Sequence, residues 1–171
     1  ATAGFEVQTR TGSRYDTAAV IVATGMHRRQ LHVEGEQRLQ RRGVAYRLVH
    51  EVEQFTDRPV AVIGGGNSGI QVALELSRMG CRVALVSSGP LTGDADELER
   101  LSRARNIEIW GDHEVVAIEG QDWVTGLRIQ QSGGGVERLL PVEGVFIEIG
   151  FLPNADCVAH LVRRNPRGEI E

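Results

Sequence analysis

The stretch Pro59-Val60-Ala61-Val62-Ile63-Gly64-Gly65-Gly66-Asn67-Ser68-Gly69 decides the fold of this 171-residue chain. Its first five residues predict a short strand buried on both faces, and this strand runs directly into glycines. Over residues 67–79 apolar side chains recur at helical spacing. Gly80 is placed to end that helix, because glycine tolerates a left-handed backbone. A strand, a glycine turn and a helix in this order are typical of the first part of a dinucleotide-binding unit.

The glycines are spaced as Gly64-x-Gly66-x-x-Gly69, and each position has its own task in holding a diphosphate. Gly64 permits a tight turn, Gly66 lets the backbone approach the pyrophosphate, and Gly69 lets the helix pack closely on the strand. The diphosphate then lies at the helix start, where free N–H groups and the helix dipole favour negative charge. The alternative is a structural turn that binds nothing, because a chain with 21 glycines can meet this spacing by chance. The residues that we expect to contact the coenzyme here are Gly64, Gly65, Gly66, Asn67, Ser68 and Gly69.

The elements after this helix predict further parallel strands and then antiparallel hairpins. Strands are expected over residues 81–86 and 106–110, with a helix between them that begins with a capping box of Asp94 and Glu97. Hairpin strands follow over residues 114–119, 123–131 and 136–140, and residues 144–150 return to the parallel sheet. The predicted fold class is α/β: a Rossmann-like NAD(P)-binding domain with a parallel sheet and a β-meander crossover.

The residues before this unit predict other elements. A hairpin is expected from residue 5 onward, and the apolar run over residues 18–23 predicts a strand buried on both faces. Residues 26–57 predict a polar, Arg-rich connection. The chain starts without Met and ends where another strand would begin, so we expect an excised piece of a longer protein.

Composition argues against several function classes. The net charge of −4 disfavours nucleic acid as a partner, because phosphate backbones bind basic surfaces. No apolar run approaches the roughly 20 residues that span a bilayer, and no signal peptide is visible, so we expect a cytoplasmic protein without a membrane partner. All 19 basic residues are arginine, which excludes Schiff-base chemistry and a P-loop lysine. Cys81 and Cys157 are expected to be small buried residues, and we expect no metal site because the histidines show no ligand spacing.

The end of the second strand bears on the choice of coenzyme. An acid there accepts bonds from the ribose hydroxyls of NAD, whereas arginine pairs with the 2′-phosphate of NADP. This chain has Ser87 and Ser88 instead, and no Arg lies between Arg82 and Arg100. NAD(H) is therefore favoured over NADP(H), with Ser87 and Ser88 as cofactor-binding residues. NADP(H) stays open as the alternative, because serine can also bond a phosphate.

Four segments together resemble the thioredoxin reductase family of flavoproteins, and within it the alkyl hydroperoxide reductase flavoproteins. They are residues 20–25, 43–46, 60–69 and 144–154. The resemblance implies an FAD-domain fragment with a connecting strand over residues 1–44, an NAD(P)H-binding domain over 45–145, and a return connection to the FAD domain over 146–171. It also implies that Gly150 contacts the coenzyme and that the full-length protein is a homodimer holding FAD. The family's FAD motifs are absent here, so this piece alone is expected to be inactive.

One position departs from the family. Its redox C-x-x-C, followed by an acid, belongs directly after Tyr46, where this chain has Arg47-Leu48-Val49-His50-Glu51. Thiol–disulfide exchange needs two thiols. The resemblance therefore implies hydride transfer from NAD(P)H to flavin without the disulfide relay, and onward to a small-molecule or protein acceptor. Arg47, His50 and Glu51 occupy the redox position, where His50 and Glu51 can exchange protons with the flavin; the alternative is a surface loop that has lost its chemistry.

Two other functions stay open. The first is a non-catalytic module that senses the nucleotide or docks a partner. For docking, the Arg-rich segment over residues 27–50 is a candidate patch for an acidic electron-transfer partner, although a solvated connection is the simpler account. The second is a two-substrate dehydrogenase, which is disfavoured because no catalytic His, Tyr or Lys group accompanies the glycines.

Overall fold

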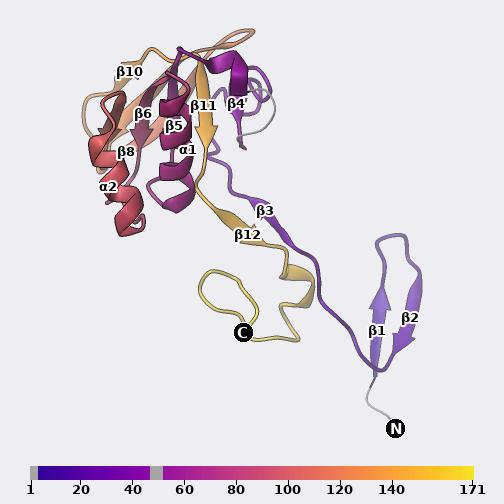
Figure 1. The fold of residues 1–171 in the computed structure, drawn as a ribbon. Coiled ribbons are helices and arrows are strands. Elements are labelled where there is room, and N and C mark those ends of the chain that lie inside the picture. The colour runs from indigo at the N-terminus through magenta and orange to yellow at the C-terminus, as the bar shows by residue number, and fades with distance from the viewer. Residues whose placement is uncertain (1–3, 47–51) are drawn as a thin grey trace. The chain divides into compact units, whose positions relative to one another are not determined.

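The computed structural model describes residues 4–46 and 52–171, and the chain divides into two compact units (Figure 1). Unit 1 consists of Ala1–His27 and Leu152–Glu171, and unit 2 consists of Arg28–Phe151. The predicted domain limits after residues 44 and 145 come from the family resemblance and stay predictions. No helix in the described ranges is both long and apolar enough to traverse a bilayer.

Among the described residues of unit 2, five strands form one parallel sheet of order β4-β11-β5-β6-β7. Every neighbouring pair runs parallel, so the chain returns to this sheet after the hairpins, as the sequence predicts. The return strand stops at Ile147, three residues before its predicted end at Gly150. The strands are β4 (Val44–Ala45), β11 (Gly144–Ile147), β5 (Pro59–Ile63), β6 (Arg82–Val86) and β7 (Ile107–Trp110).

Two layers cover this sheet, helices on one face and antiparallel strands on the other (Figure 1). The helices are α1 (Asn67–Arg78) and α2 (Ala95–Arg103). The strands β8 (His113–Gly120), β9 (Val124–Gln131) and β10 (Arg138–Leu140) pair in the order β10-β9-β8, which confirms the predicted β-meander. The predicted Rossmann-like α/β class is therefore confirmed.

The central strand β5 supplies side chains to both cores of unit 2. Successive side chains of a strand point to opposite faces of the sheet. Val60 and Val62 accordingly pack with the helices, whereas Ala61 and Ile63 pack with the meander. All four are at most 5% exposed, and each large side chain buried in this way contributes about 1.5–3 kcal/mol. An apolar run of this length is stable only with a layer on each side.

The two helices differ in how well the sequence anticipates their ends. Helix α1 ends at Arg78, one residue before its predicted end at Met79, and the predicted glycine stop, Gly80, follows Met79 with φ +82°. Asp94 does precede α2, but the predicted capping box is wrong, because its side chain makes no bond to the amides of its own helix. The Asp94 carboxylate instead accepts a bond from Asn67 Nδ2 at 3.1 Å, and Asp94 N donates to Asn67 Oδ1 at 2.7 Å. This reciprocal pair joins the starts of α1 and α2.

Unit 1 contains the predicted N-terminal hairpin, formed by β1 (Phe5–Gln8) and β2 (Arg14–Thr17). The turn between them is closed by a bond from Thr9 N to Ser13 O at 2.9 Å. A short 3-10 helix spans Asp156–Val158, and a similar one in unit 2 spans Val52–Phe55. The strands β3 (Met26–Arg28) and β12 (Phe151–Pro153) pair as a separate two-stranded sheet.

The buried strand predicted over residues 18–23 is wrong. The segment forms no strand, most of its residues are exposed, and Ile21 is 92% exposed. A strand requires hydrogen-bonded neighbours, and no segment in the described part of the chain pairs with this one. The strand predicted at the end of the chain is likewise reduced to a single bridge between Arg164 and Ile170.

Candidate functional site

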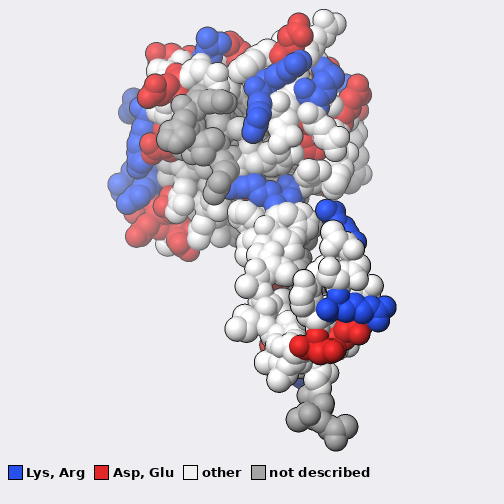
Figure 2. All heavy atoms as spheres, turned by 90° about the vertical axis from the view of Figure 1, so that its right-hand side faces the viewer, with Lys and Arg blue, Asp and Glu red and all other residues white. Residues whose placement is uncertain are grey.

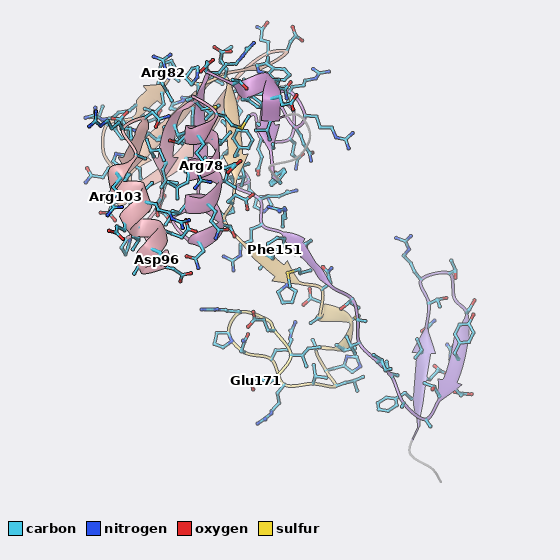
Figure 3. The ribbon with its side chains drawn as sticks, in the orientation of Figure 1. Arg78, Arg82, Asp96, Arg103, Phe151 and Glu171 are labelled. Carbon is cyan, nitrogen blue, oxygen red and sulfur yellow. The ribbon has the colours of Figure 1, made fainter. Side chains whose placement is uncertain are left out.

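A cleft of about 510 Å³ lies in unit 2 at the carboxyl ends of the parallel strands. In Figure 3, Arg82 at the start of β6 lies at one end of the sheet, and Phe151, beyond β11, lies at the other. The cleft belongs to the end after β5, β6 and β11, where open α/β sheets bind their ligands. Its lining residues are Arg29, Leu31, Ile63, Gly64, Gly65, Gly66, Asn67, Ser68, Val86, Ser87, Ser88, His113, Glu148, Ile149 and Gly150.

A second hollow of about 380 Å³ lies at the amino ends of the same strands. Pro59, Arg82 and Ile107, which begin β5, β6 and β7, are among its lining residues. Neither the glycine turn nor the start of α1 contributes to it, so it lacks the main-chain donors of the predicted diphosphate site. The carboxyl-end cleft is therefore the candidate site.

Two glycines of the fingerprint are required by packing. At Gly64 the backbone has φ +132°, and a Cβ would lie 2.1 Å from the Glu148 carbonyl oxygen. At Gly69 a Cβ would lie 2.0 Å from the Gly64 carbonyl oxygen. Any side chain at either position would force the backbone apart. These are the tight turn and the close helix packing that the spacing predicts.

Gly66 is different, because the space beside it is open. The nearest heavy atom to a Cβ built there is Thr92 Oγ1, at 3.9 Å. Gly66 is also the residue that precedes α1, and among the described residues no side chain bonds to the first amides of that helix. The first turn carries no acidic residue either. The positive end of the helix dipole is thus neither capped nor neutralised, and it lines the cleft.

Some polar side chains around this turn are hydrogen-bonded within the protein, and others are exposed in the cleft. The Asn67 amide is committed to Asp94, so Asn67 offers a ligand its main chain only. Ser87 is buried, and its hydroxyl donates to the Gly89 carbonyl at 2.7 Å, which shapes the turn after β6. Ser68 and Ser88 are exposed and line the cleft. Of the predicted hydroxyl contacts, these two are the ones open to a ligand.

The β11 side of the cleft holds groups that sequence reasoning missed. Glu148 has a side chain only 9% exposed, and it accepts a bond from Arg28 Nη1 at 3.1 Å. The guanidinium of Arg28 also lies 4.8 Å from the centre of the Phe151 ring. Arg29 N donates to Gly150 O at 3.0 Å, which holds Arg29 beside the end of β11. Glu148 could have been found from the sequence, because it is an acid inside the apolar run over residues 144–150. Arg29 is not marked by any such pattern.

His113 is the third missed residue, and it lies on the opposite side of the cleft. It begins β8, and its main-chain N donates to Ser87 O at 3.0 Å, beside the end of β6. Its Nδ1 lies 2.6 Å from the Gly111 carbonyl oxygen, and its ring meets Trp110 edge to face at 5.4 Å. This position arises from the pairing of separate strands, so no local sequence pattern indicates it.

Arg47, His50 and Glu51, the predicted occupants of the redox position, lie outside the described residues. The residue before them, Tyr46, is half-buried and donates its hydroxyl to Glu36 at 2.7 Å. Burial and the Glu36 carboxylate raise the pKa of Tyr46 above its usual range.

Glu36 itself is 1% exposed and accepts two further bonds, from Leu31 N at 2.8 Å and His32 N at 2.7 Å. The carboxylate is thus satisfied by three donors. It fixes the start of the connection and Tyr46 together. Glu36 is therefore part of the interior of unit 2, although the sequence predicted that it lies in a polar connection.

Two arginines of the proposed docking segment make internal side-chain contacts. Arg28 pairs with Glu148, and Arg38 Nη1 donates to the carbonyls of Gly120 and Gln121. On the face shown in Figure 2, basic and acidic side chains are interspersed rather than gathered by sign. The docking role of this segment stays an alternative prediction.

The two cysteines are separate. Cys81 is buried, as predicted, and its thiol lies 3.0 Å from the Phe55 carbonyl oxygen. Burial raises the pKa of the Cys81 thiol. Cys157 is exposed, so the expectation that it is buried is wrong. Within the ranges that the structure covers, no three His, Cys, Asp or Glu side chains gather into a group that could hold a metal ion.

Comparison with protein families gives one match over the whole chain. The family model described as pyridine nucleotide-disulphide oxidoreductase matches residues 1–171. The alkyl hydroperoxide reductase F protein of Staphylococcus aureus is 36% identical over 167 residues, which are 97% of this chain and 33% of that protein. Its counterpart in Staphylococcus epidermidis is 33% identical over 156 residues, covering 91% of this chain and 31% of that protein. The chain thus spans about a third of the length of these relatives.

Solved structures of thioredoxin reductases share this fold. The enzyme from Lactococcus lactis superposes with a TM-score of 0.83 at 26% identity, over 98% of this chain and 55% of that one. The enzyme from T. acidophilum superposes with a TM-score of 0.81 at 29% identity, again over 98% of this chain and 55% of that one. The resemblance inferred from the sequence is confirmed by both kinds of match.

Proposed function

From the premise that the chain belongs to the pyridine nucleotide-disulphide oxidoreductase family, we propose that it is the coenzyme-binding portion of an FAD-dependent reductase. In this proposal the cleft of unit 2 binds NAD(P)H and presents it for hydride transfer to flavin. The flavin is assigned to the full-length protein, since the one dinucleotide fingerprint found in this chain is that of unit 2. When bound, the nicotinamide supplies the hydride, and the residues of this chain bind and orient it.

The observation that carries the proposal is the open, uncapped start of α1 beside Gly66. Gly66, Asn67 and Ser68 line the cleft there, and a Cβ built at Gly66 would lie 3.9 Å from its nearest neighbour, Thr92 Oγ1. A diphosphate placed at this point gains hydrogen bonds and the favourable end of the helix dipole. Gly64 and Gly69 allow the turn, and Gly66 leaves the room that the ligand needs.

The proposed positions of the ribose and the nicotinamide follow from the strands that border the cleft. In Rossmann-like folds the adenosine ribose lies at the end of the second strand, which here is β6 with Ser87 and Ser88. Strands β6 and β11 flank β5 on opposite sides. The nicotinamide half is therefore proposed to extend toward Gly150 and the Arg28–Glu148 pair, which keeps the buried carboxylate neutralised beside the ligand.

NADH is the proposed coenzyme, in preference to NADPH. The arginine that lines the cleft, Arg29, is held at the end of β11, away from the proposed ribose position. At the end of β6 the exposed group is the hydroxyl of Ser88, which can bond a ribose but supplies no positive charge. A 2′-phosphate would therefore lie there without a guanidinium partner.

Ser88→Arg tests this choice of coenzyme. The new guanidinium is expected to raise NADPH affinity relative to NADH about ten-fold, because a bidentate pair to phosphate forms at the ribose. Isothermal titration of both coenzymes against the variant and the parent chain measures the ratio. An unchanged ratio would mean that the ribose binds elsewhere.

The electron acceptor is proposed to be a small molecule or a protein reached without the disulfide relay. Positions 47–51 are Arg-Leu-Val-His-Glu and offer no thiol. His50 and Glu51 are proposed to exchange protons near the flavin, and Arg47 occupies the same redox position. The full-length protein is further proposed to be a cytoplasmic homodimer. The missing cysteines also favour a second candidate, a module that senses the nucleotide or docks a partner without turnover.

Anaerobic mixing of the full-length protein with NADH and with NADPH tests the proposal. Bleaching of the bound flavin absorbance by one of them is the expected result, with NADH the faster. A stably bound flavin that neither coenzyme reduces would exclude the reductase. Coenzyme binding without flavin reduction would support the sensing module.

A further inference from the structure

The main chain holds His113 directly beside the end of β6. Ser87 N donates to Trp110 O at 3.0 Å, and His113 N donates to Ser87 O at 3.0 Å. The turn after β6 is therefore bonded on both sides, to the end of β7 and to the start of β8. His113 and Ser88 both line the cleft at this point. This is the position that the proposed function assigns to the adenosine ribose, and the inference below rests on that function.

The ring of His113 has one polar atom committed and one available. A carbonyl oxygen only accepts hydrogen bonds, so Nδ1, at 2.6 Å from the Gly111 carbonyl, must carry a hydrogen. In the neutral ring Nε2 is then an acceptor with a lone pair. The edge-to-face contact with Trp110, at an interplanar angle of 85°, packs the ring in this orientation. Among the described residues none bonds to Nε2.

The two protonation states of His113 recognise different ligands. A neutral Nε2 accepts a hydrogen bond from a ribose 2′-hydroxyl, but it has nothing to donate to a phosphate. A protonated ring turns Nε2 into a charged donor, and hydrogen bonds from a charged donor to phosphate are the strong ones. The same side chain thus favours NAD when neutral and NADP when charged.

Charged groups of both signs lie around His113. Its chain neighbours are Asp112 and Glu114, and Gln131 lies opposite it across the β8–β9 pair. Arg138 of β10 is stacked over Trp110 at 5.8 Å from the ring centre, and Arg29 lines the same cleft. The end of β6 presents the uncharged Ser87 and Ser88. No ion pair joins His113 to any residue in the described part of the chain, so no carboxylate there is paired with the ring.

We propose that His113 sets the coenzyme specificity of this cleft, and that its protonation shifts the preference from NAD toward NADP as the pH falls. His113 acts as a specificity-determining residue at the 2′ position of the adenosine ribose. The preference for NADH inferred from Ser88 then belongs to the neutral form of His113.

The experiment measures the affinities of NAD⁺ and NADP⁺ for the 171-residue chain by isothermal titration at pH 8 and pH 6. The 2′-phosphate of NADP⁺ itself loses charge near pH 6. The ratio of the two affinities in the parent chain is therefore compared with the ratio in His113→Gln, where the phosphate titrates in the same way. His160→Gln makes the same change at an exposed histidine outside the cleft. Thermal unfolding of each variant checks that it is folded.

For each protein the ratio of NADP⁺ affinity to NAD⁺ affinity is divided by the same ratio for His113→Gln at that pH. This normalised ratio is expected to rise about five-fold from pH 8 to pH 6 in the parent chain and in His160→Gln. His113→Lys, which stays charged at both pH values, is expected to favour NADP⁺ at both. The same pH dependence with and without His113, or no gain from His113→Lys, would overturn this inference alone. Absence of binding by both coenzymes would overturn the proposed function as well.

Discussion

Gly66 and Gly69 stand three positions apart in one motif, but the structure gives them opposite surroundings. A Cβ at Gly69 would meet the Gly64 carbonyl at 2.0 Å, whereas a Cβ at Gly66 would have no heavy atom closer than 3.9 Å. Gly69 is therefore required for the fold, whereas Gly66 is required for the proposed ligand. Substitutions at the two positions should fail for different reasons.

Gly66→Val is expected to weaken coenzyme binding at least about 30-fold, because its side chain would occupy the space of the diphosphate. The backbone of Gly66 is extended, with φ −88° and ψ 179°, which valine adopts readily. The free energy of unfolding should therefore fall by no more than about 1 kcal/mol. Titration calorimetry and urea unfolding measure the two effects.

Gly135→Val is the matched control for this variant. A Cβ there makes an ordinary contact of 3.4 Å with Gln131 Cβ, and Gly135 does not line the cleft. Its coenzyme affinity should equal that of the parent chain. If Gly66→Val binds equally well, the diphosphate does not lie at the start of α1.

Tyr46→Phe removes one of the three donors to the buried Glu36 carboxylate. A lost bond to a charged acceptor at this half-buried position should cost about 1–2 kcal/mol at pH 8. The pKa of Tyr46 is raised in the folded state. Its contribution is therefore fully present below the unfolded pKa of about 10 and is lost as the pH rises further.

Urea unfolding at pH 8 and at pH 11 measures this pH dependence. The stability difference between the parent chain and Tyr46→Phe should be smaller at pH 11 than at pH 8. Tyr15→Phe, at an exposed tyrosine in the N-terminal hairpin, is the control and should show little difference at either pH. A difference for Tyr46→Phe that is constant between the two pH values would mean that the hydroxyl does not donate to Glu36.

The elements of unit 2 that the sequence predicted are those whose pattern is local. Residues 59–63 are apolar because β5 has a layer on each face, and α1 ends before Gly80 because that glycine adopts a left-handed backbone. The run over residues 18–23 has the same apolar character, but no described segment pairs with it. An apolar pattern shows that a strand can be buried, and its neighbours decide whether it is.

The capping box failed for a related reason. The spacing of Asp94 and Glu97 fits a local motif, but Asn67, 27 positions earlier, provides both a donor and an acceptor to Asp94. A long-range partner therefore replaced the local one. Such a competition cannot be seen in one stretch of sequence.

A double-mutant cycle on Asn67→Ala and Asp94→Ala tests whether this pair joins the two helices. Asn67→Ala removes both bonds of the pair. Asp94→Ala removes only the bond to the carboxylate, because the Asp94 N–H belongs to the main chain. We expect a coupling free energy of about 1 kcal/mol between the two positions, measured by urea unfolding of the four proteins. Additive effects would show that the two side chains act independently.

For the whole molecule, the sequence predicted the fold class and the glycine edge of the cleft, but not its other walls. Gly64, Gly66 and Gly69 form one motif on one turn. Arg29, His113 and Glu148 reach the cleft from three separate segments, and the sheet order alone brings them together. The family resemblance supplied the position of Gly150 at the cleft, which periodicity could not.

The two hydrophobic cores lie entirely within unit 2. Unit 1 contributes no described residue to either core, and it exposes large apolar side chains such as Tyr15 at 60% and Ile21 at 92%. We therefore expect the polypeptide 28–151 to fold alone and to bind NADH within about two-fold of the complete chain. Circular dichroism melting and titration calorimetry test this. Loss of either the melting transition or the binding would show that unit 1 supports the site.

The alternation along β5 has a further consequence. Val60 and Val62 belong to one core and Ala61 and Ile63 to the other, so a slip of this strand by one position would exchange the two sets. The strand is also hydrogen-bonded to β11 on one side and β6 on the other. Its amide protons should then be replaced by deuterium only when the helices and the meander detach together. These residues should mark the slowest-exchanging segment of the chain.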